Sequence, residues 1–516
     1  MPDEPRHQPR RAFTRFQRDI AGKTIGYDNV GSALGNIVAF NEAGEIAVTL
    51  QENNHIAIVD AATAKVLSHF SAGTVNLENI DTKKDGAFKF DGNKENVLRE
   101  PDTVKWIDND RLVIANEGDL DGGSRGFTIF TKDGKVAYES GASFEYEVAK
   151  AGHYPEARNK KGVEPEGADV ATFGEDRLIF VASERGSVVG VYKDTGGEPQ
   201  FLQLLPSGIG PEGLVAIPSR NLFVTANETD LIEDNLARSH VMIYERAEGA
   251  PAYPQITSDL TSAGVPLGWG ALSGLTADPA VPGKLFAVSD SAYDAQPSIY
   301  SIDATKTPAM ITEKTVVTRN SAVAEKLDLE GIAIDGAGGF WLASEGDPEK
   351  EVPHAVLHID AKGAITQEIS LPEALLAGQT RSALEGITMA GSSDDAMLVM
   401  AIQREWKDDP KGQVKLLAYK PKSKEWSAVR YPLDKTEAGW VGLSEIAAYD
   451  GKLYVIERDN LIGTDARLKA IYAVDLAGFK PAALGGELPV VEKTLVRDLI
   501  PDMKAATKIG RASCRE

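Results

Sequence analysis

Carboxylate residues recur in this sequence at the borders of short apolar runs. The clearest case is the run Leu-Glu-Gly-Ile-Ala-Ile at 329–334, which is followed by a Gly turn and a second apolar run that leads to Glu345. If the two runs form an antiparallel hairpin, Glu330 begins the first strand and Glu345 ends the second. The two carboxylates then lie at the same end of the hairpin. One such hairpin is ordinary, but the chain repeats it.

The repeated unit has an acidic or Ser residue at its start, two short apolar runs and usually a further run. From residue 102 to residue 444 this start recurs at intervals of 46–64 residues, and an earlier unit at 36–60 lacks the acidic start. Three or four short strands at this period are typical of a β-propeller. We therefore predict an all-β fold, a β-propeller with eight repeat units, seven or eight blades, and four antiparallel strands in each blade.

Few segments depart from this pattern. Residues 372–379 are expected to form a short helix, and the polar residues 71–99 a long exposed loop. A parallel α/β fold would need amphipathic helices between its strands, and a β-sandwich would not repeat so regularly. We expect an irregular arm at 1–30, the propeller at 31–500 and a tail at 501–516 that is an artefact or marks a truncation.

In a propeller, the start of the first strand and the end of the second strand of each blade lie on one face, around the mouth of the channel. The alignment therefore predicts two rings of carboxylates, which Ser273 and Ser444 interrupt. The first ring contains Asp102, Glu166, Glu212, Glu330 and Glu385, and the second contains Glu52, Glu117, Glu184, Glu228, Asp290, Glu345 and Glu457. So many converging carboxylates cannot all stay ionised without cations. Oxygen ligands favour Ca²⁺, or Mg²⁺ or Mn²⁺, over zinc.

Two interpretations of these carboxylates stay open. They bind metal ions or a ligand, or each Glu accepts backbone N–H groups from the neighbouring blade and locks the blades together. Three second-strand ends also carry an arginine, namely Arg185, Arg404 and Arg458. A guanidinium beside metal-bound carboxylates is suited to holding a phosphate or carboxylate through two hydrogen bonds. The alternative for these arginines is salt bridges between blades.

The charge balance restricts the partners. With 55 Lys and Arg against 77 Asp and Glu, the formal net charge is −22, which argues against nucleic acid and anionic membranes as partners. The single cysteine, Cys514, allows no disulfide within the chain. No apolar run is long enough to span a membrane, and no export signal is visible before the first repeat. We expect a monomer.

Other motifs do not point to a function. The Gly-x-Gly-x-x-Gly sequence at 208–213 precedes a predicted strand instead of a helix, and Glu212 within it would repel a pyrophosphate. His354 and His358 are four residues apart, but they lie in a predicted strand and lack the His-Glu-x-x-His pattern of a metalloprotease. No Gly-x-Ser-x-Gly nucleophile elbow occurs.

Several motifs together resemble the phytase-like family called "esterase-like activity of phytase". They are the Leu-Glu-Gly-Ile units, the Ala-Ser-Glu-Gly-Asp-Pro segment at 343–348 and the segment at 493–501. The resemblance is clearest from about 325 to 501, and the upstream repeats look like those of secreted bacterial propellers. It implies a propeller that is exported to the periplasm or the cell exterior, with phosphoester or ester hydrolysis as its activity.

Three functional hypotheses follow. The first is a metal-dependent hydrolase, with Ca²⁺ at the acidic mouth, a metal-activated water as nucleophile and a small anionic phosphoester as substrate, held by Arg185, Arg404 or Arg458. The second is a non-catalytic propeller that binds cations for rigidity and a ligand or partner through its loops. The third is a metal-dependent lactone or ester hydrolase.

Overall fold

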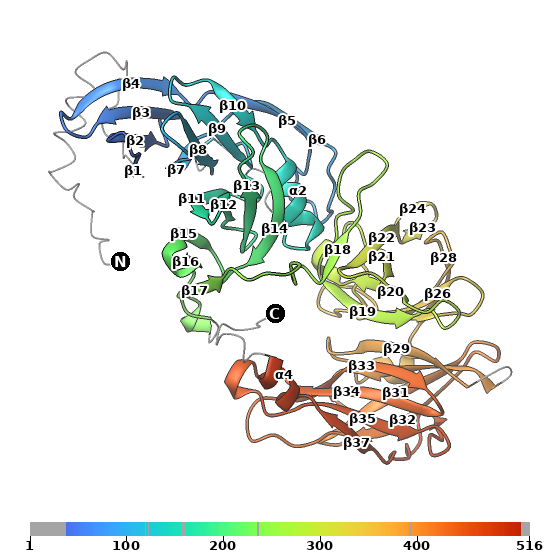
Figure 1. Cartoon of the computed structure of the whole chain (residues 1–516). Helices are drawn as coiled ribbons and strands as arrows, with labels where there is room; N and C mark the ends of the chain where they lie inside the picture. The colour runs from blue at the N-terminus through green and yellow to red at the C-terminus, as the bar shows by residue number, and fades with distance from the viewer. Residues whose placement is uncertain are drawn as a thin grey trace, which may run out of the picture. The chain divides into compact units, whose positions relative to one another are not determined.

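The computed structural model describes residues 38–118, 120–121, 123–155, 161–234, 237–391 and 395–506 (Figure 1). The predicted arm at 1–30 and most of the predicted tail lie outside these residues. The chain divides into two compact units. Unit 1 comprises residues 1–82, 91–148 and 153–253, and unit 2 comprises residues 83–90, 149–152 and 254–516.

Unit 1 contains four antiparallel sheets of three or four strands, here called blades 1 to 4, in which neighbouring strands are consecutive in the chain. Blade 1 is β1 (Val38–Phe40), β2 (Glu45–Leu50), β3 (His55–Asp60) and β4 (Lys65–Ser71). Blade 2 is β7 (Pro101–Trp106), β8 (Arg111–Asn116), β9 (Phe127–Thr131) and β10 (Val136–Glu139). Blade 3 is β11 (Pro165–Phe173), β12 (Asp176–Ser183), β13 (Val188–Lys193) and β14 (Gln200–Pro206), and blade 4 is β15 (Pro211–Ile217), β16 (Leu222–Asn227) and β17 (His240–Glu245).

Unit 2 contains four further sheets, blades 5 to 8. Blade 5 is β18 (Ile256–Ser258), β19 (Leu272–Ala277), β20 (Lys284–Ser289), β21 (Ser298–Asp303) and β22 (Ala309–Val316). Blade 6 is β25 (Leu329–Ile334), β26 (Phe340–Ser344), β27 (Ala355–Ile359) and β28 (Ile365–Ser370). Blade 7 is β29 (Leu384–Ala390), β30 (Met397–Ile402), β31 (Gln413–Lys420), β32 (Glu425–Pro432) and β36 (Ala482–Ala483), and blade 8 is β33 (Val441–Tyr449), β34 (Lys452–Asp459), β35 (Lys469–Asp475) and β37 (Thr494–Asp498).

Within each unit, the first strands of successive blades lie side by side. In unit 1, β7 contacts β11 and β11 contacts β15; in unit 2, β19 contacts β25, β25 contacts β29 and β29 contacts β33. Short antiparallel sheets that meet along their first strands are the building plan of a β-propeller. The prediction of an all-β propeller is therefore confirmed, and the eight repeats of the sequence correspond to eight blades among the described residues. Five of the blades have the expected four strands, whereas blade 4 has three described strands and blades 5 and 7 have five.

The first hairpin of blades 2 to 8 carries a β-bulge at one recurring position. The register shifts lie at Pro101/Val104, Pro165/Ala168, Pro211/Gly213, Leu272/Leu275, Leu329/Gly331, Leu384/Ile387 and Leu443/Glu445. In blade 6 the bulge contains Glu330 and begins at Leu329, whose side chain is fully buried. A bulge redirects the local side chain, so the repeated acidic residue is set apart from the regular alternation of its strand.

The glycine after the acidic residue permits close contact between neighbouring first strands. A Cβ atom on Gly331 would lie 2.6 Å from the Glu385 carbonyl oxygen and 2.8 Å from the Ile387 nitrogen, both in blade 7. A Cβ atom on Gly167 would lie 2.2 Å from the Glu212 carbonyl oxygen in blade 4. Backbone packing therefore explains why a glycine follows the acidic residue in the repeat, because only glycine leaves room for the backbone of the next blade.

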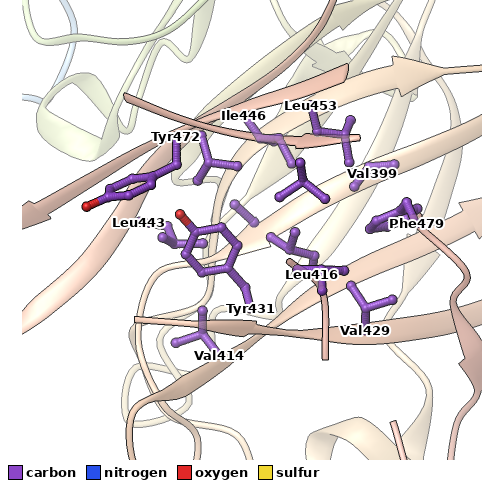
Figure 2. Packing of buried hydrophobic residues seen from close by; sticks show 14 of the residues in the cluster. Val399, Val414, Leu416, Val429, Tyr431, Leu443, Ile446, Leu453, Tyr472 and Phe479 are labelled. Carbon is purple, nitrogen blue, oxygen red and sulfur yellow. The ribbon is translucent and has the colours of Figure 1, made fainter. Parts of the chain in front are cut away.

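Apolar side chains fill the space between adjacent blades. Figure 2 shows one such cluster, in which Leu416 and Val429 of blade 7 face Leu443 and Leu453 of blade 8. Alternate residues of a strand reach this layer, because Val414, Leu416 and Ala418 of β31 belong to this cluster whereas Leu417 and Tyr419 belong to the cluster on the other face. Burial of such side chains stabilises each blade by about 1.5–3 kcal/mol for every large aliphatic residue.

Two expectations about the connecting segments need correction. Residues 71–99 are not one long loop, because they contain the hairpin of β5 (Thr74–Ile80) and β6 (Gly92–Leu98). Helix α2 (Ser143–Lys150) was not expected; its buried Phe144 and Val148 lie one turn apart in a run too short to show a clear helical period. The predicted helix at 372–379 is confirmed as α3 (Glu373–Leu376).

Smaller elements complete the description. They are the two-stranded sheet of β23 (Thr318–Arg319) and β24 (Ala322–Val323), α4 (Ile500–Ala506), η1 (Pro218–Arg220), η2 (Ile232–Asp234), η3 (Ser291–Tyr293) and η5 (Gly463–Asp465). None of the helices in the described part of the chain has the length and apolar character needed to span a bilayer.

Substitution of Gly331 by Ala should destabilise the protein by about 1–3 kcal/mol, because the added methyl group meets backbone atoms that cannot move away independently. The free energy of unfolding from urea denaturation measures this effect. Gly197→Ala is the matched control, since a Cβ atom there has no neighbour within 4 Å. Equal stability of the two variants would contradict the proposed close contact between blades.

Candidate functional site

The structure brings carboxylates together in two places. In unit 1, one carboxylate oxygen from each of Glu117, Glu166 and Glu184 lies within 4.8 Å of the other two; this group is called the Glu166 cluster. In unit 2, the corresponding oxygens of Asp328, Glu330 and Glu345 meet the same distance condition and form the Glu330 cluster.

Two members of each cluster occupy equivalent positions, Glu166 and Glu184 in blade 3 and Glu330 and Glu345 in blade 6, whereas the third members, Glu117 and Asp328, differ in position. In blade 6, Leu329 pairs with Ser344, so Glu330 lies in the bulge and Glu345 directly follows β26. The Glu345 N–H donates to the Asp328 carbonyl oxygen at 2.7 Å. In blade 3, the Glu184 N–H likewise donates to the Glu164 carbonyl oxygen at 3.0 Å. The same backbone contact therefore fixes the acidic residue after the second strand in both blades.

Neighbouring blades supply neutral hydrogen-bond donors to the Glu330 cluster. The Ser273 hydroxyl of blade 5 donates to the Glu330 carboxylate. The Ala383 N–H, just before blade 7, donates to Glu345 Oε1 at 2.6 Å, and the Ser291 N–H donates to Asp328 Oδ1 at 3.1 Å. Among the described residues, no Lys or Arg forms an ion pair with these three carboxylates, so their negative charges are not neutralised there.

Burial and mutual repulsion make the Glu330 cluster costly to ionise. Burial, opposed by the Ser273 hydrogen bond and reinforced by the neighbouring Glu385, raises the pKa of Glu330 to about 8. Burial likewise raises the pKa of Glu345 to about 8, and the pKa of Glu445 to about 8. Protonation or a cation must relieve this repulsion near neutral pH.

The Glu166 cluster adjoins an internal positive charge. Arg185 Nε lies 2.7 Å from Glu164 Oε2, and its Nη1 lies 2.7 Å from Glu184 Oε1. Burial, and then the charges of Glu117 and Glu184, raise the pKa of Glu166 to about 9. Glu166 Oε2 is buried and accepts no hydrogen bond within the described structure. The Glu166 cluster therefore has a guanidinium beside it, whereas the Glu330 cluster has none among the described residues.

The donor sets of both clusters fit a hard divalent cation. Ca²⁺ binds oxygen ligands at about 2.3–2.6 Å, so two ligands of one ion lie at most about 5 Å apart. The carboxylate oxygens of each cluster satisfy this limit, at no more than 4.8 Å from one another. The buried, unpartnered Glu166 Oε2 is a further atom that a cation would satisfy. Glu166 and Glu330 would be the central ligands of their clusters.

Most of the remaining predicted ligands occupy equivalent positions in other blades. By register, Asp102 and Glu117 belong to blade 2, Glu212 and Glu228 to blade 4, and Asp290 follows β20 in blade 5. Asp290 Oδ1 accepts the Ala292 N–H at 2.7 Å and caps η3. Glu52 lies in an exposed turn, and its neighbour Gln51 donates to Glu117 instead.

The strand register of blade 8 does not place Glu457 at the position that Glu345 has in blade 6. It pairs with Leu443, so it occupies the position of Ser344 in blade 6 and not that of Glu345. The side chain is fully buried and accepts hydrogen bonds from the Tyr431 hydroxyl at 2.9 Å and from Lys493 Nζ at 2.6 Å. Glu457 is therefore held by Tyr431 of blade 7 and by Lys493, just before β37, and is not part of either cluster.

Two of the three predicted arginines lie over one aromatic ring. The guanidinium carbon of Arg404 is 4.4 Å from the ring centroid of Trp440, and that of Arg458 is 5.2 Å away. Arg458 Nε donates to the Ser444 hydroxyl at 2.6 Å. Within the described residues, neither arginine has an Asp or Glu at ion-pair distance, in contrast to Arg185.

One of these arginines, Arg458, acts on Glu385, the acidic residue in the bulge of blade 7. Burial raises the pKa of Glu385 to about 7, although its hydrogen bond from Gln403 and the positive charge of Arg458 oppose the rise. Glu385 in turn contributes to the raised pKa of Glu330. Positive and negative groups thus lie next to each other within unit 2.

Sequence reasoning missed Asp328, Gln403 and Trp440 in this region, and it noted Glu445 only as the neighbour of Ser444. Asp328 stands two residues before Glu330, as Glu164 stands two residues before Glu166, and this parallel was a usable signal. Glu445 replaces the repeat glycine in blade 8. Gln403 and Trp440 carry no charge, so a search for acidic and basic repeats passes over them.

Fold and site define a β-propeller with carboxylate clusters at the bulges of its first strands. Residues 267–510 match the family model "Esterase-like activity of phytase", which confirms the phytase-like resemblance for this part of the chain and suggests a propeller hydrolase family. Residues 35–122 and 120–197 match a second model, the choice-of-anchor I domain. No functionally curated protein gave a significant match.

Solved propeller structures show only distant similarity. A streptogramin B lyase is 13% identical over 72% of this chain and 91% of its own, with a TM-score of 0.23. A virginiamycin B lyase from Staphylococcus aureus is 10% identical over 82% of this chain and 92% of its own, with a TM-score of 0.22. The Dos1 propeller is 10% identical over 89% of this chain and 95% of its own, with a TM-score of 0.24. These values carry no functional argument.

Without a bound cation, the free energy of unfolding should decrease as the pH rises from about 4.5 to about 8. Folded Glu330 and Glu345 keep their protons up to about pH 8, whereas both would lose them near the ordinary value of 4.5 in the unfolded chain. The folded state therefore binds more protons across this window, and stability falls with rising pH. Melting temperatures measured in EDTA test this direction, and the value at pH 8.5 should be lower than the value at pH 5.5.

Addition of Ca²⁺ should reverse this trend, because the ion stabilises the ionised carboxylates. The rise in melting temperature on adding Ca²⁺ should be larger at pH 8.5 than at pH 5.5, and Glu330→Gln should reduce it. A Ca²⁺ effect of the same size at both pH values would contradict the assignment.

Substitution of Arg185 by Gln should leave Glu164 and Glu184 without their cation and destabilise the protein by about 1–3 kcal/mol. This is below the value for a fully buried pair, because the Arg185 side chain is 44% exposed. Added Ca²⁺ should restore part of the loss. Arg177→Gln is the control, since Arg177 is 39% exposed and its partners Asp108 and Asp194 also pair with Arg111. Equal losses in both variants would argue against a special role for Arg185.

Proposed function

We propose that the protein is a calcium-dependent phosphoester hydrolase whose site lies in unit 2. The observation that carries this proposal is that carboxylates and arginines without ion-pair partners among the described residues occur together in unit 2. The Glu330 cluster has no ion-pair partner among the described Lys and Arg residues, and among the described residues Arg404 and Arg458 have no Asp or Glu at ion-pair distance, although the charge of Arg458 acts on Glu385. A divalent cation and an anionic substrate would satisfy both groups at once. The phytase-like match of residues 267–510 supports the same class.

In this proposal the carboxylates bind the metal ion and the arginines bind the substrate. Asp328, Glu330 and Glu345 would hold Ca²⁺, which when bound supplies positive charge and lowers the pKa of a water molecule. Arg404 and Arg458 would bind phosphate oxygens through paired N–H donors. The Trp440 ring beneath both guanidinium groups restricts their orientation. Held in this way, the arginines can bind an anion with little loss of side-chain entropy.

A second candidate function is a non-catalytic propeller in which cations stabilise the packing of the blades. The contacts from Ser273 and Ala383 to the Glu330 cluster favour it, because one bound ion would then connect blades 5, 6 and 7. Both candidates require metal binding. They differ in whether the arginines act on a substrate.

Purified protein should hydrolyse p-nitrophenyl phosphate or phytate in the presence of Ca²⁺ and lose this activity in EDTA. Arg404→Ala and Arg458→Ala should each lower kcat/KM by about tenfold to a hundredfold, the value expected for a charge-assisted hydrogen bond. Melting temperature in Ca²⁺ should change little in these variants.

Arg220→Ala is the control, since Arg220 is an exposed arginine of unit 1 that lies outside both clusters. Glu330→Gln should remove both the activity and the response of the melting temperature to Ca²⁺. No turnover by the wild-type protein on either substrate, together with a normal response to Ca²⁺, would reject the hydrolase and favour the structural function.

A further inference from the structure

A buried histidine joins two backbone segments that lead to the Glu330 cluster. His354 directly precedes β27 and is only 3% exposed. Its Nδ1 accepts a hydrogen bond from the Gly346 N–H at 2.7 Å, and its Nε2 lies 3.0 Å from the Thr380 carbonyl oxygen. One side chain therefore links the segment that follows β26 to the segment that precedes β29.

Both of these segments hold Glu345, a member of the Glu330 cluster. Gly346 directly follows Glu345, so the hydrogen bond from its N–H to His354 fixes the main chain at this point. Thr380 stands three residues before Ala383, whose N–H donates to Glu345 Oε1 at 2.6 Å. His354 thus connects the main chain of Glu345 with the segment whose amide orients the Glu345 carboxylate.

The chain folds back on itself between Glu345 and His354. Asp347 and Val352 exchange two backbone hydrogen bonds of 3.0 Å, which close this loop. A Cβ atom on Gly346 would lie 2.4 Å from the His354 nitrogen and 2.6 Å from the Val352 carbonyl oxygen. The closed loop therefore brings the imidazole to the residue after Glu345, although the two lie far apart along the strand order of the blade.

The two partners of His354 determine which ring nitrogen carries the proton. A backbone N–H can only donate, so Nδ1 must present its lone pair to Gly346. A carbonyl oxygen can only accept, so Nε2 must carry the hydrogen that points to Thr380. Burial lowers the pKa of His354, which favours this neutral ring. Both hydrogen bonds therefore require one tautomer of the neutral imidazole.

Trp406 fixes the plane of the imidazole and the same backbone segment. The rings of His354 and Trp406 are stacked, with centroids 5.8 Å apart and 30° between their planes. Trp406 is 2% exposed, and its Nε1–H donates to the Ser382 carbonyl oxygen at 3.0 Å. Ser382 directly precedes Ala383. The indole therefore supports both the histidine and the amide donor of the Glu345 carboxylate.

We propose that His354 is a positioning residue of the metal site, which fixes Glu345 for the binding of a divalent cation. His354 is not itself a member of the Glu330 cluster, so it acts through Glu345. Residues that orient a metal ligand through hydrogen bonds typically change the metal affinity by about tenfold to a hundredfold. The inference rests on the metal site of the proposed function and names the residue that holds one of its ligands in place.

Three substitutions separate the two hydrogen bonds of His354 from its packing. His354→Phe keeps a ring against Trp406 and removes both bonds, His354→Asn keeps an acceptor near the place of Nδ1, and His354→Gln keeps a donor near the place of Nε2. In isothermal titrations of the full chain with Ca²⁺, His354→Phe should raise Kd by about tenfold to a hundredfold. His354→Asn and His354→Gln should each lose less affinity than His354→Phe.

His358→Phe is the matched control. His358 lies on β27, packs on Trp341 with ring centroids 4.3 Å apart, and its Nε2 is 2.9 Å from Asp335 Oδ2. Asp335 follows β25, at the opposite end of the β25–β26 hairpin from Glu345. This variant also replaces a packed, hydrogen-bonded histidine, but its Ca²⁺ affinity should equal that of the wild type.

Amide hydrogen exchange in EDTA adds a readout that needs no metal. Gly346 and Ala383 should exchange faster in His354→Phe than in the wild type, and His358→Phe should leave both amides unchanged. If His354→Phe does not fold, His354→Gln gives the same comparisons, because it lacks the acceptor for Gly346.

The outcomes distinguish this inference from the proposed function. Ca²⁺ binding by the wild type with unchanged affinity in His354→Phe, or equal exchange of both amides, would overturn the role of His354 and leave the metal site standing. No Ca²⁺ binding by the wild type, together with faster exchange of both amides in His354→Phe alone, would reject the proposed function and support the positioning of Glu345.

Discussion

The close approach of neighbouring first strands is the constraint on which the rest of the structure depends. At the bulges, the backbone of one blade comes so near to the next that a Cβ atom on Gly167 or Gly331 would overlap with it. This contact positions the acidic residue before each glycine beside its counterpart in the next blade. The packing that forms the fold therefore concentrates negative charge, and the protein must neutralise that charge locally.

The two carboxylate clusters meet this requirement in different ways. Beside the Glu166 cluster, Arg185 pairs with Glu164 and Glu184 and supplies the cation from within the chain. In the Glu330 cluster the residue after Glu345 is a glycine, and the described structure has no such pair. The same repeat thus yields one site whose negative charge is largely balanced by an arginine of the chain and one site whose charge is not. The second site would need an external cation, which is why we place the proposed chemistry in unit 2.

The sequence alone predicted the β-propeller fold class and the central residues of both clusters, because the Glu-Gly repeat reflects the backbone contact directly. It could not give the register of the last two blades. One residue of register determines whether Glu457 or Arg458 takes the position of Glu345, and only the pairing with Leu443 decides this.

Crystals of the protein grown or soaked with Mn²⁺ in place of Ca²⁺ give the most direct test of the central claim, because the anomalous signal of manganese locates the ion without reference to any activity. The account predicts an anomalous peak between the carboxylates of Asp328, Glu330 and Glu345, and its disappearance in Glu330→Gln crystals. A fully occupied ion elsewhere in unit 2, with these three carboxylates free of metal, would contradict it.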